Sequence, residues 1–352
     1  MSLLIHGGDL YSAAAIYGGK PEAWLDLSTG INQHSYPLPA IDNTTWQQLP
    51  YVNPALIRAA QSYYGSHPCL ASNGSQNVIQ LLPSILHQLG NLRAAWLPDV
   101  GYQEHRQAWA HQGDTLTYNG LNSQVAAQQI EAALQANRLG HLVIINPNNP
   151  TGEMFSLKQL MLWAQKLETV DGFLVVDEAF IDTYPQASLL SQKLADNMVV
   201  LRSVGKFFGL AGMRLGFTFA AQEVLDHLTK NIGPWSVNGP AQTVAIAALT
   251  DTPWQAQMRD QLANQEAQQL HIWQAPMLTL GARLTTSHGL FRSFIMAADL
   301  AQKLHHSAAK KGILIRPVAI NSSRSLLRFG NVDLSHSHAL EHCHTWIQQE
   351  ST

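Results

Sequence analysis

Cysteine, charge and long apolar runs are all scarce in this chain of 352 residues. Its two cysteines, Cys69 and Cys343, cannot form a disulfide framework, and so few fit a reducing compartment. Charged residues make up 13%, the net charge is −3, and no cluster of lysines and arginines argues for nucleic acid as a partner. No apolar segment approaches the ~20 residues of a membrane span, and the N-terminus lacks a signal-peptide pattern. We therefore expect a cytoplasmic protein with no nucleic-acid or membrane partner.

Apolar residues are plentiful, at 46% of the chain, and short apolar runs alternate with helical stretches. The expected strands are residues 94–97, 142–145, 173–176 and 199–201, bounded by Asn, Pro, Asp or Gly. The expected helices are residues 75–89, 123–137, 156–167 and 187–195. Such alternation predicts an α/β fold with a mostly parallel sheet, and ligands bind such sheets at the carboxyl ends of the strands.

The composition changes near Thr252, which suggests a domain boundary. Residues 252–278 are predicted to form one long polar helix, followed by elements at 291–296, 298–311, 313–315, 326–329 and a last helix from about 335. This order is typical of a small α+β domain. We expect an extended N-terminal arm over residues 1–40 that joins the small domain, a large domain over 41–251, and the small domain over 252–352.

Lys206 lies in a glycine-rich loop, within the segment LRSVGKFFGLAGMRLGF, directly after an expected strand. A lysine in a tight, partly desolvated loop can act as an amine nucleophile. Ser203 and Arg214 flank it, and a guanidinium binds phosphate oxygens well. A P-loop is excluded because Val200 stands where that motif needs glycine. For this segment alone, an ordinary surface lysine remains the alternative.

Other candidates stand at the ends of the expected strands. They are Asn149 in the turn after 142–145, Asp177 after 173–176, and Tyr102 after 94–97. Gly74, Ser75 and Gln76 begin the helix 75–89, where backbone N–H groups and the helix dipole favour an anion. Each of these groups alone is also consistent with a turn, a cap or a residue at the edge of the core.

Taken together, the candidates offer an amine, an acid, an aromatic ring, an amide and a phosphate site divided between two segments. Pyridoxal 5'-phosphate (PLP) needs this set of groups. A lysine forms the Schiff base, an acid keeps the pyridine nitrogen protonated, and the phosphate anchors the ring. The sequence therefore predicts PLP as the cofactor.

The order of these motifs along the chain resembles the class I/II aminotransferase superfamily of fold-type I PLP enzymes. The motifs are Gly74-Ser75-Gln76, Tyr102, Asn149-Pro150-Thr151-Gly152, Asp177-Glu178-Ala179, Ser203-x-x-Lys206 and Arg214, and the match spans roughly residues 25–330. The resemblance implies a fold-type I PLP-dependent transferase fold, with a mostly parallel sheet of the seven-stranded type in a large domain and a small α+β domain. It also implies a homodimer with shared active sites.

The resemblance assigns a role to each candidate. Lys206 is the Schiff-base lysine and Asp177 the partner of the ring nitrogen, and both are catalytic. Asn149 reaches the ring hydroxyl, Tyr102 stacks on the ring, and Tyr51 reaches the cofactor of the partner subunit. The phosphate lies among Gly74, Ser75, Gln76, Ser203 and Arg214.

Within the superfamily, three segments resemble the threonine-phosphate decarboxylase branch. They are His6-Gly7-Gly8-Asp9, the stretch from Trp24 to Asn32, and the stretch from Arg202 to Gly212. This resemblance implies decarboxylation of L-threonine O-3-phosphate to 1-aminopropan-2-ol O-phosphate in cobalamin biosynthesis. The residues expected to bind the substrate are His6, Asn32, Arg316 and Arg328, with Arg324 as a rival to Arg328.

Two alternatives stay open from the sequence. The first is an aminotransferase acting on histidinol phosphate or a related phosphorylated amino compound. Phe180 and Gly205 differ from the tyrosine and serine that are usual in those enzymes. The second is a PLP-binding protein without catalysis.

The histidines at 336, 338, 342 and 344 are predicted to lie on a solvated terminal helix, and we expect no metal site.

Overall fold

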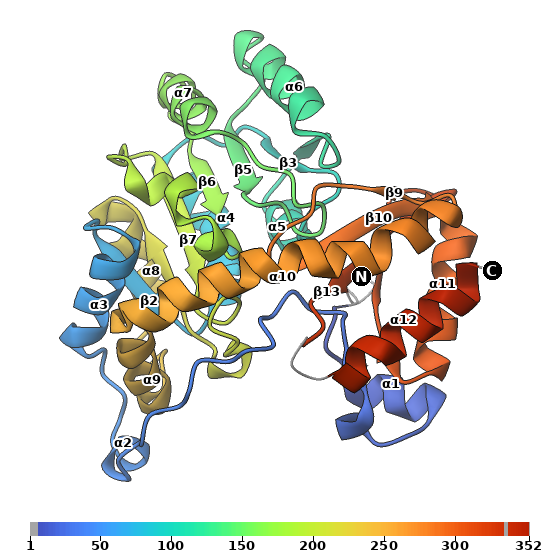
Figure 1. Ribbon diagram of the computed structural model, residues 1–352. Helices are drawn as coiled ribbons and strands as arrows, with labels where there is room; N and C mark the ends of the chain where they lie inside the picture. The colour runs from blue at the N-terminus through green and yellow to red at the C-terminus, as the bar shows by residue number, and fades with distance from the viewer. Residues whose placement is uncertain (1–5, 334–336, 352) are drawn as a thin grey trace. The chain divides into compact units, whose positions relative to one another are not determined.

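The computed structural model describes residues 6–333 and 337–351, and its chain divides into two compact units (Figure 1). Unit 1 comprises residues 1–34, 150–152 and 257–352, and unit 2 comprises residues 35–149 and 153–256. Within the described residues, no helix combines the length and apolar character that crossing a bilayer requires.

Unit 2 is built on a seven-stranded sheet in the order β2-β8-β7-β6-β5-β3-β4. Its strands are β2 (Cys69–Ser72), β3 (Ala95–Pro98), β4 (Thr115–Tyr118), β5 (His141–Ile145), β6 (Leu174–Asp177), β7 (Met198–Ser203) and β8 (Gly216–Phe219). Strand β8 runs antiparallel to the other six strands, which all share one direction. The predicted mostly parallel sheet is confirmed, and so are all four strands expected from the sequence, each to within two residues at either end.

Most helices of unit 2 flank this sheet, and the short α2 instead packs against α9 (Figure 1). They are α2 (Thr44–Gln47), α3 (Pro54–Tyr64), α4 (Ser75–Leu89), α5 (Gln103–Ala110), α6 (Ser123–Gln135), α7 (Leu157–Glu168), α8 (Gln222–Ile232) and α9 (Gly239–Thr250). Helix α4 shows why they form. Val78, Ile79, Leu82 and Leu86 recur at helical spacing, are at most 1% exposed, and belong to the core cluster shared with the sheet and with α5 and α8.

Unit 1 contains a four-stranded antiparallel sheet in the order β12-β13-β10-β9. These strands are β9 (Arg283–Leu284), β10 (Phe291–Ala297), β12 (Arg316–Ala319) and β13 (Arg324–Gly330), and the helices are α1 (Leu10–Tyr17), α11 (Ala298–Lys310) and α12 (Ser337–Ser351). A separate parallel pair joins β1 (Leu25–Asp26) to β11 (Ile313–Leu314). Helix α10 (Thr252–Thr279) begins in unit 2 and continues in unit 1, where Trp273 stacks on Phe329 of β13 with ring centroids 4.6 Å apart. The expected start of the last helix, near residue 335, lies outside the described residues.

Two expectations about local structure are wrong. Residues 187–195 form short 3-10 turns, Pro185–Ala187 and Leu189–Ser191, rather than a helix. The cause is Glu178, whose carboxylate accepts hydrogen bonds from the Ser188 hydroxyl and the Leu189 N–H, each at 2.6 Å. These bonds tie the segment to the end of β6 and compete with helical hydrogen bonding.

Within the segment expected to be an extended arm, Leu10–Tyr17 instead form helix α1. Asp9 caps α1 by accepting the Ser12 N–H at 2.9 Å, and Ala13 of α1 packs in a small cluster with Trp24. Leu27, directly after β1, is fully buried in the core of unit 1. The segment is therefore a structural part of that unit, because apolar burial outweighs the flexibility that its glycines suggest.

Candidate active site

Parallel pairing brings the ends of β5, β6 and β7 to one edge of the unit 2 sheet. Ile145 pairs with Asp177, and Asp177 pairs with Leu201. The Asn146 N–H donates to the carbonyl oxygen of Asp177 at 2.9 Å. The turn after β5, the carboxylate that ends β6 and the residues that end β7 therefore lie side by side, where α/β sheets place their ligands.

Asp177 is 3% exposed, and both of its carboxylate oxygens have partners. Oδ2 lies 2.9 Å from Nε2 of His105, and Oδ1 accepts the Ala179 N–H at 3.1 Å. A buried carboxylate requires such partners. His105, which is 2% exposed on α5, is not among the residues predicted from the sequence. Its spacing of three residues from Tyr102 is the one local sign that both side chains share a helical face.

Lys206 lies in the turn that follows β7. The Gly209 N–H donates to its carbonyl oxygen at 3.3 Å, and its side chain is half-buried. Its Nζ lies 5.5 Å from the ring centroid of Phe180, a residue that is 4% exposed. A Cβ at Gly205 would lie 2.8 Å from the Cα of Ala211, so this close approach of two backbone segments requires glycine before the lysine.

The residues predicted to bind phosphate come together around the start of α4. A Cβ at Gly74 would lie 2.9 Å from Nη2 of Arg214, so the guanidinium rests against the helix N-terminus. Gly216 pairs with Ser203, and a Cβ at Gly216 would lie 2.8 Å from the backbone nitrogen of Ser75. In the described part of the chain, no side chain caps α4. Helix N–H groups, a hydroxyl and a guanidinium in one place form a site that suits an anion.

The turn after β5 contains three asparagines with different surroundings. Asn146 accepts the Phe155 N–H at 2.8 Å through Oδ1. Asn148 donates through Nδ2 to the carbonyl oxygens of Val100 and Gly120, at 2.8 and 2.9 Å. These two side chains hold the turn in place, and Asn149 is half-buried at its end, which is the position that the sequence assigns to a ligand contact.

Arg202 stands next to Ser203 in the most highly charged buried network of unit 2. It bonds Glu178 at 3.0 Å and Asp182 at 2.7 Å, its Cζ lies 4.3 Å from the ring centroid of Tyr64, and all three charged residues are at most 2% exposed. Burial alone would lower the pKa of Arg202, but the two carboxylates outweigh it and raise that pKa. Because Glu178 follows Asp177, the network fixes the end of β6 against the end of β7.

We expect Arg202→Met to lower the free energy of unfolding by ~3–5 kcal/mol, because it leaves Glu178 and Asp182 buried without their cation. Urea denaturation of the purified chain measures this loss. Arg93→Met is the matched control, since Arg93 is exposed and bonds Asn137 at the surface. A loss below ~1 kcal/mol for Arg202→Met, within the range of ordinary substitutions, would contradict the role of the network.

Two of the segments predicted to bind substrate, the one that follows His6 and the one that carries Arg328, contact Ser28 in unit 1. A Cβ at Gly7 would lie 2.3 Å from the carbonyl oxygen of Ser28, so the chain next to His6 passes directly over it. The Gly8 N–H donates to Ser28 Oγ at 2.7 Å, and Nη2 of Arg328 donates to the same Ser28 carbonyl oxygen. The His6 side chain is exposed beside these contacts.

Arg316 and Arg328 face each other across β12 and β13. Arg328 is 2% exposed, and burial, followed by repulsion from Arg316, lowers its pKa to about 9. Like charges directly opposite on neighbouring strands repel, so the pair is suited to an anion. The rival Arg324 is exposed at the start of β13. Asn32 is 2% exposed and accepts the His34 N–H at 3.0 Å.

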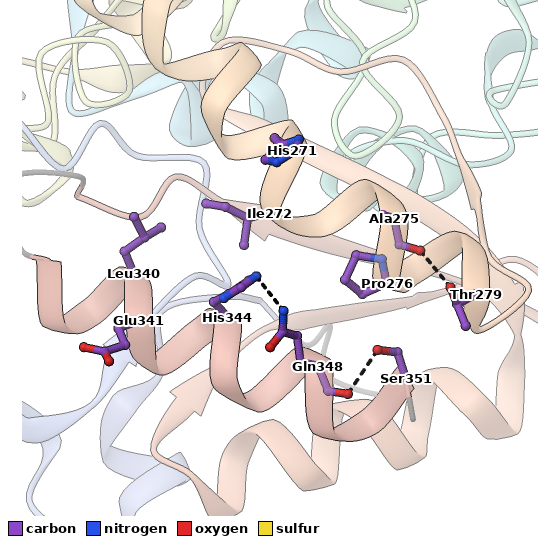
Figure 2. Close-up of a pocket in the computed structure, with 10 residues that line it drawn as sticks. All are labelled: His271, Ile272, Ala275, Pro276, Thr279, Leu340, Glu341, His344, Gln348 and Ser351. Atoms are coloured by element: carbon purple, nitrogen blue, oxygen red, sulfur yellow. Dashed lines mark hydrogen bonds between the residues drawn. The ribbon is translucent and has the colours of Figure 1, made fainter.

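A pocket of about 790 Å³ lies in unit 1 along α10 and α12 (Figure 2). Its polar side chains include His271, Glu341 and His344, and Gln348 bonds His344 at 3.0 Å. None of the residues predicted to bind cofactor or substrate lines it, so this pocket is not the predicted site.

Among residues 6–333 and 337–351, no group of three or more His, Cys, Asp or Glu is placed to hold a metal, and residue 336 lies outside the described residues.

Comparison with known proteins gives one family match and several named relatives. The sequence profile of "Aminotransferase class I and II" matches residues 30–336. The chain is 38% identical over 321 residues to a threonine-phosphate decarboxylase of Pseudomonas aeruginosa, which covers 89% of each chain. It is 40% identical over 252 residues to a threonine-phosphate decarboxylase of a Sinorhizobium species, covering 70% of this chain and 72% of the relative.

Among solved structures, the fold is similar to that of histidinol-phosphate aminotransferase from Sinorhizobium meliloti in complex with pyridoxal-5'-phosphate. The TM-score is 0.76 at 19% identity, covering 99% of this chain and 96% of that one. At this identity the likeness establishes the fold, which is the fold-type I aminotransferase architecture expected from the sequence.

Proposed function

Because this chain belongs to the aminotransferase class I and II family, we propose that it is a PLP-dependent enzyme that decarboxylates L-threonine O-3-phosphate. The product is 1-aminopropan-2-ol O-phosphate, and the role is the supply of this amine to cobalamin biosynthesis. The observation that carries the proposal is 38% identity, across 89% of both chains, to an enzyme named for this reaction.

The residues of unit 2 fit the proposed cofactor. The N-terminus of α4 and the Arg214 guanidinium are pressed so closely together that a Cβ at Gly74 would collide with Nη2, and this donor set suits a phosphate group. Ser75 and Ser203 add donors to it, and Gln76 belongs to the same helix start. Asp177 is a buried acid at the adjacent strand end, suited to the pyridine nitrogen.

The remaining cofactor roles fall to residues around the same strand ends. Lys206 would hold the cofactor covalently through Nζ, Tyr102 would pack against its ring, and Asn149 would bond the ring hydroxyl. When bound, PLP withdraws electrons from the α-carbon of an amino acid. Asp177 would keep the pyridine nitrogen protonated, and His105, 2.9 Å from Asp177, would hold that carboxylate in place. With the substrate amine bound in its place, Nζ of Lys206 would be free to donate the proton that replaces the lost carboxylate on the α-carbon.

The substrate carries two anionic groups, a carboxylate and a phosphate. Arg328 and Arg316, opposed on neighbouring strands, bind one anion better than either arginine could alone. His6 and Asn32 complete the set of residues that we assign to the substrate. Holding both ends of the substrate fixes which bond of the α-carbon lies perpendicular to the cofactor ring, and that orientation selects loss of the carboxylate over loss of the α-hydrogen.

A homodimer in the cytoplasm is the proposed working form of the enzyme. Tyr51 is 71% exposed, and its ring lies 6.1 Å from that of Trp235, which is 44% exposed. Exposed aromatic pairs of this kind are typical of protein interfaces, and we assign Tyr51 to the cofactor of the partner subunit.

Both cysteines, Cys69 and Cys343, are free thiols, which fits a reducing compartment.

The proposed function is tested by incubating the protein with PLP and L-threonine O-3-phosphate, without any keto acid. We expect CO₂ and the phosphorylated amine in equal amounts over many turnovers. Amino-group transfer from histidinol phosphate to 2-oxoglutarate, with no CO₂ from threonine phosphate, would overturn the proposal and assign the chain to the aminotransferases.

A further inference from the structure

Glu104, near the start of α5, connects the residues at the two ends of the proposed cofactor site. Its Oε2 accepts hydrogen bonds from Nε2 of Gln76 at 2.6 Å and from Nε2 of Gln80 at 2.9 Å. Oε1 of Gln76 in turn accepts the hydroxyl of Tyr102 at 2.9 Å. A short chain of hydrogen bonds therefore runs from a carboxylate on α5, through an amide on α4, to the phenol of Tyr102.

The charge of Glu104 sets the direction of each bond in this chain. A carboxylate only accepts hydrogen bonds, so Gln76 must turn its NH₂ group toward Glu104 and its carbonyl oxygen toward Tyr102. The phenol must then donate. Without Glu104 the Gln76 side chain loses the carboxylate that fixes its position and orientation, and the anchor that it gives the phenol is weakened. Hydrogen bonds to an ionised acceptor are also shorter and stronger than neutral ones, in agreement with the 2.6 Å distance.

The Tyr102 ring is restrained from two directions. Its hydroxyl is anchored to Gln76, and its ring packs at 80° to that of His105, with centroids 6.3 Å apart. His105 is the residue that bonds Asp177. A stacking residue whose ring plane is already fixed loses little conformational entropy when the ligand binds, and this favours binding.

Resting on the proposed function, we propose that Glu104 is a positioning residue that holds the Tyr102 ring at the angle required to stack on the cofactor, acting through Gln76. Gln76 is the neighbour of Ser75 in α4, where we place the cofactor phosphate. The same residue thus belongs to the phosphate end of the site and to the anchor of the stacking ring. Glu104 itself needs no contact with the cofactor in this role.

The test is a double-mutant cycle on cofactor affinity, measured by equilibrium dialysis of the protein with PLP. We expect Glu104→Ala and Tyr102→Phe each to raise the dissociation constant about fivefold, as for the loss of one hydrogen bond. The double variant should also show about fivefold, rather than the ~25-fold of independent effects. Glu104→Gln, which keeps an acceptor oxygen for Gln76, should recover most of the affinity.

A second readout separates positioning from general destabilisation. The circular dichroism of bound PLP depends on the asymmetry of its surroundings, and we expect Glu104→Ala and Tyr102→Phe to weaken this band equally. Gln80→Ala is the matched control, because it removes a bond to the same Glu104 oxygen but leaves the path to Tyr102 intact. Its affinity should stay within twofold of the wild type.

The outcomes distinguish this inference from the proposed function. If the wild-type protein does not bind PLP, the proposed function fails and the inference fails with it. If the wild type binds PLP but Glu104→Ala binds it equally well, or if the effects of the two substitutions multiply, the positioning role alone is overturned.

Discussion

We expect replacement of Lys206 with alanine to lower kcat for L-threonine O-3-phosphate by at least ~10³-fold, because under the proposed function this lysine is both the covalent attachment of the cofactor and the proton donor. Lys206 is the lysine of the turn after β7, half-buried with its Nζ near the Phe180 ring. Stopped assays of CO₂ release from enzyme saturated with PLP measure the effect.

Borohydride reduction gives an independent view of the same residue. We expect the wild-type protein to keep a reduced pyridoxyl group on Lys206, found by peptide mass, and the alanine variant to keep none at that position. Lys230→Ala, an exposed lysine on α8, is the matched control and should retain full activity. A Lys206→Ala variant with more than a tenth of wild-type turnover would contradict the covalent role.

The second large effect is expected for Asp177→Asn, which keeps the shape of the side chain but removes its negative charge. We expect kcat to fall by ~10²–10³-fold, the range seen when one preorganised electrostatic contact to a reacting centre is lost. The absorption spectrum of bound PLP should change as well, because the pyridine nitrogen is no longer held protonated. Steady-state kinetics and absorbance titration against pH measure the two effects.

Asp171→Asn makes the same chemical change in the loop that precedes β6, at the other end of the strand from Asp177. Asp171 is exposed in a left-handed backbone conformation, φ 54°, which asparagine adopts readily. This control should leave kcat unchanged. Equal activities for Asp177→Asn and the wild type would remove Asp177 from the reaction.

The central architecture could be predicted from the sequence because buried parallel strands have a simple signature. Each of the four expected strands of the large sheet is a short, mostly apolar run, and β5 and β6 are buried along their full length. Strands β2, β4 and β8 are not predicted, and β4, with the sequence TLTY and exposed residues, lacks this signature. Once strands alternate with helices, the position of a ligand site at the strand ends follows from topology. This is why Asp177, Ser203 and the turn after β5 could be grouped from the sequence alone.

Other features depend on contacts between distant segments, which no local pattern reports. The segment 187–195 has a helix-like pattern, but the Glu178 carboxylate accepts hydrogen bonds from Ser188 and Leu189, and these bonds replace helical ones. Helix α1 is eight residues long and is held by packing of Ala13 with Trp24 and neighbours far along the chain. The contact of His105 with Asp177, at 2.9 Å, depends on the packing of α5 against the end of β6 and leaves no mark in the local sequence.

The roles of the site residues divide in the same way. The phosphate candidates could be grouped because glycine, serine and arginine are typical of anion-binding sites. In the structure, Gly74, Ser75, Ser203 and Arg214 lie near one helix start. The use of the Gln76 side chain as an anchor for Tyr102 could not be read from the sequence, because it depends on Glu104 in another helix. The substrate roles of His6, Asn32, Arg316 and Arg328 remain predictions.

The central claim is that the enzyme breaks the bond from the α-carbon to the carboxylate and leaves the α-hydrogen in place. The most direct test is turnover of ordinary L-threonine O-3-phosphate in ²H₂O, followed by mass spectrometry and proton NMR of the amine. We predict that each product molecule keeps its original α-hydrogen and gains one deuterium at the carbon that lost CO₂. Loss of the α-hydrogen, with formation of a keto product and no CO₂, would show that the other bond is broken and would contradict the account.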